Sequence, residues 1–111
     1  MSAIISWDSA EVRGNIDDPR GYAKLFVNEK IGAEHLTMHI SVIKPGKRAH
    51  DAHQHEGEEI YFILEGKAKV TIEDESIIAE AHTAVFVNGP IMHGISNAGD
   101  DVLKYMVIIA K

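Results

Sequence analysis

The recurrence of short strand-like segments predicts an all-β fold of the sandwich or barrel class, and the length predicts a single domain. Short apolar or alternating segments recur along the chain with turn residues between them, a pattern typical of antiparallel sheets rather than of units that alternate strand with helix. The length of 111 residues allows one compact domain, residues 1–111, which buries roughly two thirds of the surface of its unfolded chain. The composition, 45% hydrophobic and 25% charged, is that of an ordinary globular protein.

Turn residues divide the chain into candidate strands. Asp18-Pro19-Arg20-Gly21 and Lys44-Pro45-Gly46-Lys47 are typical turns. Between Asp8 and Gly14 the spacing of Asp8 and Glu11 favours a single helical turn. The strands that we expect are residues 4–7, 22–28, 35–43, 59–64, 68–72, 76–79, 84–87, 92–96 and 102–110.

Two of these strands carry further information. Along residues 35–43 an apolar set alternates with a polar set: Leu36, Met38, Ile40 and Val42 against His35, Thr37, His39 and Ser41. We expect the apolar set to pack inward and His35 and His39 to lie on the surface, with a place lining the site as the alternative for the two histidines. Residues 59–64 are largely apolar on both faces, as in a strand between a barrel interior and a subunit interface, and so predict a homodimer.

Composition and charge exclude several classes of function. The chain has no cysteine, so a metal ion would have to be held by nitrogen and oxygen ligands. Its net charge of −6, with Lys and Arg scattered, argues against a nucleic-acid partner. No apolar run is long enough to span a membrane, and the N-terminus lacks a signal pattern, so we expect no membrane partner and a cytoplasmic protein.

Three histidines and one glutamate are spaced so that they can hold one divalent ion. In extended backbone His53 and His55 point to the same face, because alternate side chains share a face. The polar segment around Gly57 predicts a turn, after which Glu59 returns to that face from the next strand. His93 follows a strand pair later, so the hypothesis is a metal site formed by His53, His55, Glu59 and His93.

The same residues carry a family resemblance. The stretch from Pro45 to Gly66 resembles the first signature of the cupin superfamily, which is a glycine, an H-x-H pair, a glutamate after a short spacer, and a later glycine. The matching residues are Gly46, His53, His55, Glu59 and Gly66, with one extra residue between Gly46 and His53. In the second signature His93 and Asn97 keep the H-x3-N spacing. Residues 82–90 depart from the proline and glycine positions of that signature.

The resemblance covers residues 36–110 and implies a cupin-like double-stranded β-helix, or jelly-roll barrel. In a single domain, residues 1–34 would supply N-terminal strands and a short helical turn. Residues 35–111 would then form the barrel with both ligand motifs. The ion would be manganese, iron or nickel ahead of zinc, cobalt or copper, with two coordination positions left open in octahedral geometry.

Three functions fit such a site, because the cupin fold does not by itself select a reaction. The first is a metal-dependent enzyme that acts on a small oxygenated metabolite by Lewis-acid and proton-transfer chemistry. The second is a dioxygenase with the same ligands, and the third is a non-catalytic module that binds a small molecule or a metal.

Tyr61 and His50 are the candidate proton carriers. Tyr61 lies two residues after Glu59 and should face the same interior, although a plain core tyrosine fits equally well. His50 precedes the H-x-H pair, where an exposed turn histidine is the alternative. Met38, Ile40, Phe86 and Met106 would form apolar walls of the site or ordinary core.

Overall fold

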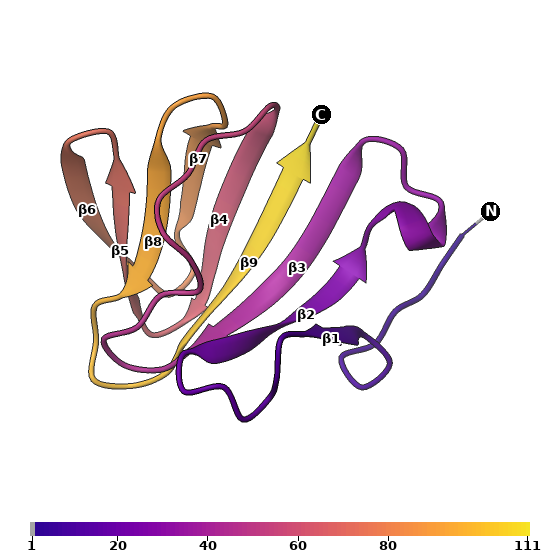
Figure 1. Ribbon diagram of the computed structural model, residues 1–111, viewed down its shortest axis with the longest axis horizontal. Coiled ribbons are helices and arrows are strands. Elements are labelled where there is room, and N and C mark those ends of the chain that lie inside the picture. The colour runs from indigo at the N-terminus through magenta and orange to yellow at the C-terminus, as the bar shows by residue number, and fades with distance from the viewer. Residues whose placement is uncertain (1) are drawn as a thin grey trace.

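Two antiparallel sheets face each other in a jelly-roll arrangement (Figure 1), in a computed structural model that describes residues 2–111. The larger sheet has the strand order β1-β2-β3-β9-β4-β7, and the smaller has the order β6-β5-β8. The strands are β1 Glu11–Arg13, β2 Gly21–Val27, β3 Leu36–Ile43, β4 Glu58–Glu65, β5 Lys67–Ile72, β6 Glu75–Glu80, β7 Ala84–Asn88, β8 His93–Asn97 and β9 Leu103–Ala110.

No α-helix occurs in residues 2–111. The one helical element there is the 3₁₀ turn η1 Glu29–Ile31. The side chain of Asn28 accepts a hydrogen bond from the backbone N–H of Lys30, and Gly32 ends the turn in the left-handed conformation. No helix in the described part of the chain is long and apolar enough to cross a membrane.

From residue 21 onward the expected strands are present, and their ends differ from the prediction by one residue at most. The prediction fails before that point. Residues 4–7 form no strand, and the edge of the sheet is instead taken by β1, which pairs with β2. The expected helical turn is reduced to one bond from the backbone N–H of Ala10 to the carbonyl of Ser6, because the chain has already entered β1 at Glu11.

The two faces of β3 are reversed with respect to the prediction. Ser41 is buried at 1% exposure and pairs with the buried Tyr105, so the polar face lines the interior. Leu36, at the start of the apolar face, is 51% exposed. The physical reason is that this part of the interior is a cavity whose wall includes polar and charged side chains, so that His39 and Ser41 are stable inside the barrel.

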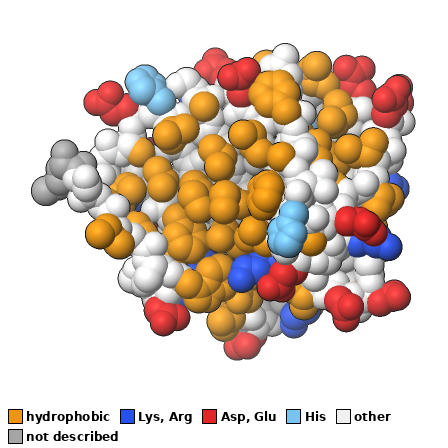
Figure 2. Space-filling model, turned by 180° about the vertical axis from the view of Figure 1, so that it is seen from behind, with side chains coloured by type: hydrophobic (Ala, Val, Ile, Leu, Met, Phe, Trp, Pro, Cys, Tyr) orange, Lys and Arg blue, Asp and Glu red, His pale blue; other side chains and the backbone are white. Residues whose placement is uncertain are grey.

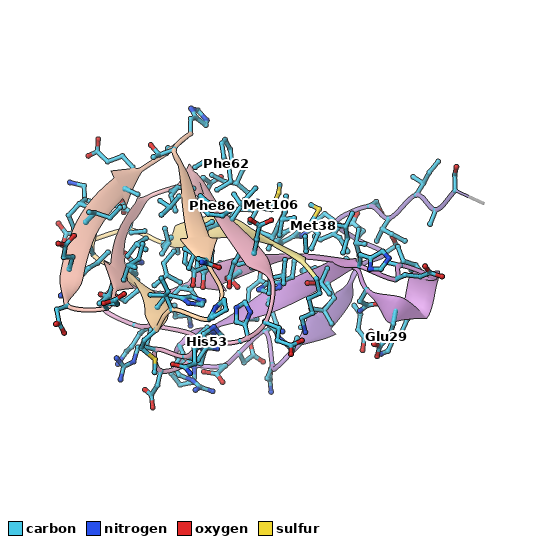
Figure 3. All side chains as sticks on the ribbon, turned by 90° about the horizontal axis from the view of Figure 1, so that it is seen from above. Glu29, Met38, His53, Phe62, Phe86 and Met106 are labelled. Carbon is cyan, nitrogen blue, oxygen red and sulfur yellow. The ribbon has the colours of Figure 1, made fainter. Side chains whose placement is uncertain are left out.

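The apolar face of β3 is therefore part of the outer surface of the larger sheet. Its cross-strand rows run Met38–Ile108–Ile60–Phe86 and Ile40–Met106–Phe62–Ala84. Figure 3 shows Met38, Phe62, Phe86 and Met106 on the side of the sheet away from His53, and Figure 2 shows apolar side chains gathered over this face. We call these two rows the outer patch. Of the two alternatives for Met38, Ile40, Phe86 and Met106, that of walls of the site is wrong, since none of them lines the cavity. Ile40 is buried at 8% exposure, whereas Phe86 is exposed.

Between the sheets lies the apolar core. Its fully buried members include Ile43 and Ile63 from the larger sheet and Val70 from the smaller one. Burial of one such side chain contributes about 1.5–3 kcal/mol. Several core residues, among them Tyr61 and Tyr105, also line the cavity, whereas none of the four candidate ligands belongs to the core.

Asn97 ties the end of β8 to two other segments. Its side-chain Nδ2 donates to the carbonyls of Ile43 and Asp101, at 3.0 and 2.8 Å, and its Oδ1 accepts from the backbone N–H of Gly99 at 2.9 Å. The residue is 5% exposed. In the H-x3-N motif, Asn97 thus has a structural role.

We expect Asn97→Ala to lower the free energy of unfolding by about 2 to 4 kcal/mol, because it leaves buried carbonyls without a donor. Urea unfolding of the metal-free protein measures this value. Asn88→Ala, on an exposed strand end, is the control and should change it by less than about 0.5 kcal/mol. Equal effects in the two variants would contradict the assigned role.

Candidate metal centre

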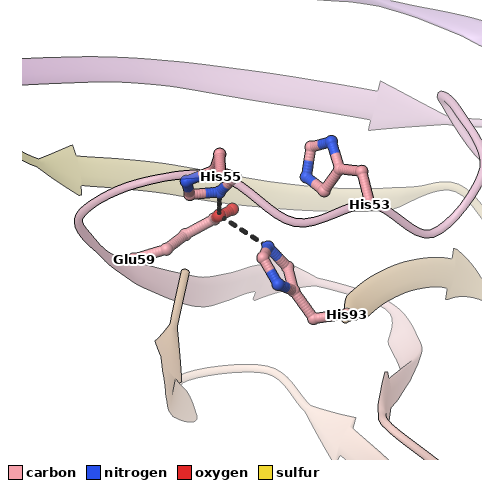
Figure 4. A group of neighbouring side chains, drawn as sticks. All are labelled: His53, His55, Glu59 and His93. Atoms are coloured by element: carbon pink, nitrogen blue, oxygen red, sulfur yellow. Dashed lines mark hydrogen bonds and ion pairs between the residues drawn. The ribbon is translucent and has the colours of Figure 1, made fainter. Parts of the chain in front are cut away.

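The four candidate ligands converge from three parts of the fold (Figure 4). Glu59 lies on β4 of the larger sheet, His93 begins β8 of the smaller sheet, and His53 and His55 come from the connection between β3 and β4. His53 and His93 exchange backbone hydrogen bonds of 2.8 and 2.9 Å in an isolated bridge. The segment around His53 forms a single bridge and not a longer extended run, yet His53 and His55 turn to the same point, as expected.

The ligand atoms of the four residues all lie within 4.8 Å of one another. His55 Nε2 lies 2.6 Å from Glu59 Oε1, and His93 Nε2 lies 3.0 Å from the same oxygen. An ion bonded to all four at about 2.1 Å would hold these atoms about 3 to 4 Å apart. Small side-chain rotations therefore suffice to form such a centre.

The outer nitrogens of two rings show which nitrogen faces the centre. His55 Nδ1 donates to the carbonyl of Glu56 at 2.7 Å, and His93 Nδ1 donates to the carbonyl of Ile91 at 2.6 Å, because a carbonyl can only accept. In the neutral rings Nε2 then has a lone pair that points at the Glu59 carboxylate, which is also an acceptor. A cation among these atoms satisfies all of them at once, as in metal-bound histidines whose other nitrogen is hydrogen-bonded.

His53 supplies an independent observation of the same kind. Its Nε2 is buried and has no hydrogen-bond partner among residues 2–111. Burial, together with the nearby His50 and His93 rings, lowers the pKa of His53. The ring is thus held in the neutral form that binds metals. A buried, unpaired nitrogen beside two imidazoles and a carboxylate fits a divalent ion with nitrogen and oxygen ligands.

Two glycines allow the backbone to hold His55 in place. Gly57 has a φ of +90°, and a Cβ there would meet the carbonyl oxygen of Ala110. A Cβ on Gly89 would meet the carbonyl of Gly57 and would lie 2.7 Å from the carbonyl oxygen of His55 and 2.9 Å from its Nδ1. The close packing of Gly89 thus fixes the position of the His55 ring.

We expect Gly89→Ala to weaken metal binding by about 10–100-fold, as the loss of a group that orients a ligand does. The new methyl group must displace either the His55 ring or the backbone beneath it. Gly99→Ala is the control, since its Cβ would meet Lys67 Cβ at an ordinary 3.4 Å. Competition with a fluorescent chelator measures the affinity, and identical values in the two variants would refute this account.

A cavity of about 440 Å³ opens beside the four residues. His53 and Glu59 are part of its wall, and the two predicted proton carriers, Tyr61 and His50, also line it. Tyr61 is 2% exposed, whereas His50 is exposed at the rim, 4.4 Å from the His53 ring. The structure thus brings all six residues singled out from the sequence to one place.

Tyrosines in this wall resist ionisation. Burial, and then the negative charge of Glu59, raises the pKa of Tyr61 well above its ordinary value. Burial raises the pKa of Tyr105 to about 12, and Glu59 adds to the increase. Both phenols are therefore hydrogen-bond donors at neutral pH rather than bases.

Six polar residues of the cavity wall were not singled out as site residues from the sequence: Arg13, Asp18, Arg20, Tyr22, Ser41 and Tyr105. His39 also lines the cavity, which was the alternative to the surface position that we expected for it. Burial, then the charge of Arg13 and the His50 ring, lowers its pKa to about 4. The period-two pattern did place His39 and Ser41 on one face, and only the direction of that face was wrong.

The fold and the site together define the class of protein, a jelly-roll barrel with a candidate three-histidine, one-glutamate metal centre at the wall of its cavity. The family described as "Cupin domain" matches residues 39–109, and the chain belongs to this family. No curated protein matches it.

Solved structures share the fold at low sequence identity. A predicted oxalate decarboxylase from Thermotoga maritima has a TM-score of 0.81 and 19% identity, with 97% of this chain and 98% of that chain covered. The polyketide cyclase RemF from Streptomyces resistomycificus has a TM-score of 0.79 and 16% identity, covering 99% and 80%. An RmlC-like cupin family protein from Methanocaldococcus jannaschii, described as a double-stranded β-helix, has a TM-score of 0.72 and 21% identity, covering 90% and 88%. These likenesses establish the double-stranded β-helix fold.

Proposed function

We propose that the protein is a metal-dependent enzyme that acts on a small oxygenated metabolite by Lewis-acid and proton-transfer chemistry. The observation that carries the proposal is that two of the four candidate ligands, His53 and Glu59, line a cavity of about 440 Å³. A purely structural metal site is closed by its protein ligands, whereas a catalytic site keeps a position open to substrate. The cavity volume is in the range of small-molecule sites.

The residues around the cavity have distinct tasks in this proposal. His53, His55, Glu59 and His93 hold one divalent ion, for which manganese, iron and nickel are the first choices, and the bound ion supplies Lewis acidity toward a carbonyl or carboxylate oxygen. Tyr61 donates a hydrogen bond to the substrate from the buried wall. His50 exchanges protons with solvent at the rim.

The test combines metal analysis with hydrogen exchange. Protein purified without chelator is analysed for bound metals and is then incubated in D₂O with a panel of hydroxy acids, keto acids and aldoses. We expect deuterium exchange or conversion of at least one compound, seen by proton NMR, that is lost on chelation and restored by the ion. A fully loaded protein that changes no compound of the panel would overturn the proposal, and oxygen consumption would point to the dioxygenase reading.

We further propose that two copies of the chain pack through the outer patch. Phe86, on the edge strand β7, is 60% exposed, and its cross-strand neighbour Ile60 on β4 is 37% exposed. The two cross-strand rows of the patch contain no charged side chain. Exposed apolar surface of this kind marks an interface, and the same patch on two copies is self-complementary about a two-fold axis.

We expect light scattering at micromolar concentration to give twice the mass of the chain for the wild type. Phe86→Lys should give the mass of a single chain, because it replaces the most exposed large apolar side chain of the proposed interface with a charge. Ile78→Lys is the matched control, since Ile78 is 57% exposed but lies on β6 of the smaller sheet. A monomeric wild type would contradict the proposed dimer.

A further inference from the structure

Arg13, exposed at the end of the edge strand β1, lines the cavity whose wall includes His53 and Glu59 of the candidate metal centre. Its guanidinium Nη2 lies 3.3 Å from His39 Nε2. A guanidinium can only donate, so this nitrogen of His39 accepts, and the His39 ring is neutral. The half-buried imidazole thus holds the cation over the interior face of β3 without neutralising its charge.

Each of the other charged side chains of the cavity wall has a partner, which is an opposite charge for Arg20 and Asp18 and a pair of histidines for Glu59. Arg20 donates to both oxygens of Asp18, at 3.2 and 3.1 Å, and Glu59 faces His55 and His93. Lysine and arginine ion pairs within residues 2–111 involve Arg20, Lys30, Arg48 and Lys67. Within that range Arg13 has no carboxylate partner.

An unpaired guanidinium in this cavity is a binding group for an anion. The chain as a whole has a charge of −6, so its surface repels anions. Inside the cavity, by contrast, the net charge is positive when a divalent ion is opposed by Glu59 alone and Arg13 has no counter-charge. Such a positive recess in an acidic protein concentrates small anions.

We propose that Arg13 binds a carboxylate group of the substrate, so that the substrate class is a small carboxylic acid whose second oxygen function reaches the metal centre. This proposal rests on the proposed function for the second point of attachment. A carboxylate carries one charge and two oxygens, which matches a single planar guanidinium. A phosphate ester, with nearly two charges, would call for more than the one unpaired cation that the cavity wall offers.

The distances in the sheet suit a molecule of a few carbon atoms. Arg13 is held over β3 by His39, and Glu59 lies on β4, with β9 between the two strands. Neighbouring strands are about 4.8 Å apart, so the two points of attachment are on the order of 10 Å apart along the sheet. The curvature of the barrel shortens that path across the cavity.

The test uses malonate, succinate, glutarate and 2-oxoglutarate as probes, with succinamide as the uncharged match for succinate. Calorimetry measures their affinity for the cobalt-loaded protein, and the visible spectrum of cobalt reports binding at the ion. We expect at least one dicarboxylate to bind the wild type and Arg13→Gln to weaken it by about 10–100-fold, the value of a charge-assisted hydrogen-bond pair. Succinamide should bind both proteins equally weakly.

Two variants make the result specific. Arg48→Gln removes the same charge from a residue that pairs with Asp51 and does not line the cavity, and it should change the affinity by less than about twofold. Arg13→Lys keeps the charge without the planar fork and should give an intermediate loss. Circular dichroism checks that each variant is folded.

Several outcomes would overturn the assignment of Arg13. These are undiminished dicarboxylate binding in metal-loaded Arg13→Gln, absence of dicarboxylate binding by the loaded wild type at millimolar concentration, and tighter, Arg13-dependent binding of inorganic phosphate. Metal content measured in the same samples separates this proposal from the proposed function. If the wild type binds a dicarboxylate but no metal, and Arg13→Gln alone among the variants loses that binding, the metal-dependent reaction is refuted and the anion site is supported.

Discussion

Glu59→Ala is expected to leave the protein folded and almost free of bound metal. Glu59 is the sole carboxylate of the candidate centre, and its Oε1 contacts the ligand nitrogens of both His55 and His93. Loss of a direct ligand should lower the affinity by more than about 10–100-fold, the loss that is typical when a group that only orients a ligand is removed. Elemental analysis of protein purified without chelator measures the metal, and circular dichroism measures the fold.

The fold should persist because the apolar core does not include Glu59. His55→Ala should behave in the same way, since His55 is only partly buried and contributes to the centre rather than to the core. Glu58→Ala is the matched control: it removes a carboxylate one residue away, but Glu58 is exposed on the other face of β4. Unchanged metal content in Glu59→Ala would refute the ligand set.

The strands were predictable because turns and alternation are local properties of the sequence. Gly66, for example, ends β4 in a left-handed turn that only glycine adopts without strain. The N-terminal segment was not predictable in this way. Ile4 has a strand-like neighbourhood, yet it is 96% exposed, because β1 already pairs with the edge of β2. Which of two short segments takes a sheet edge is decided by tertiary contacts.

The direction of the β3 face could not be read from its alternation, because a barrel with a wet interior inverts the usual pattern. His39 and Ser41 face a cavity that satisfies polar groups, while Met38 faces outward, onto the outer patch. The period of two gives the two sets of side chains, but burial of the apolar set assumes a dry interior and a wet exterior. Both assumptions fail for β3 if the outer patch is an interface.

The candidate ligands could be found from sequence because their spacing is set by one turn and one strand pair. The cavity residue Arg13 could not, because β1 is a three-residue edge strand that has a single apolar residue, Val12, and is too short to show alternation. Its neighbour His39 is 26 residues away in the chain, and their contact depends on the pairing of β1 with β2 and of β2 with β3. Contacts between three strands follow from register, which the sequence pattern leaves undetermined.

Acidification is expected to destabilise the metal-free protein through His39. Burial lowers the pKa of His39 from 6.5 to about 4, and Arg13 and His50 add to the effect. Between these two pH values the unfolded chain binds a proton at this residue and the folded protein does not, so the free energy of unfolding falls as the pH falls. Below about pH 4 both states are protonated there, and the loss is complete.

The size of this effect follows from the difference between the two pKa values. Each unit corresponds to about 1.4 kcal/mol, and partial exposure of the ring reduces the total to roughly 2 kcal/mol. Urea unfolding at pH 7 and pH 4.5, in the presence of chelator, measures it. Other groups also titrate in this range, so the decisive quantity is the difference between the wild type and His39→Gln, whose amide oxygen can still accept from Arg13 but takes up no proton. The wild type should lose about 2 kcal/mol more than the variant, and parallel losses in the two proteins would show that His39 is not held neutral by the fold.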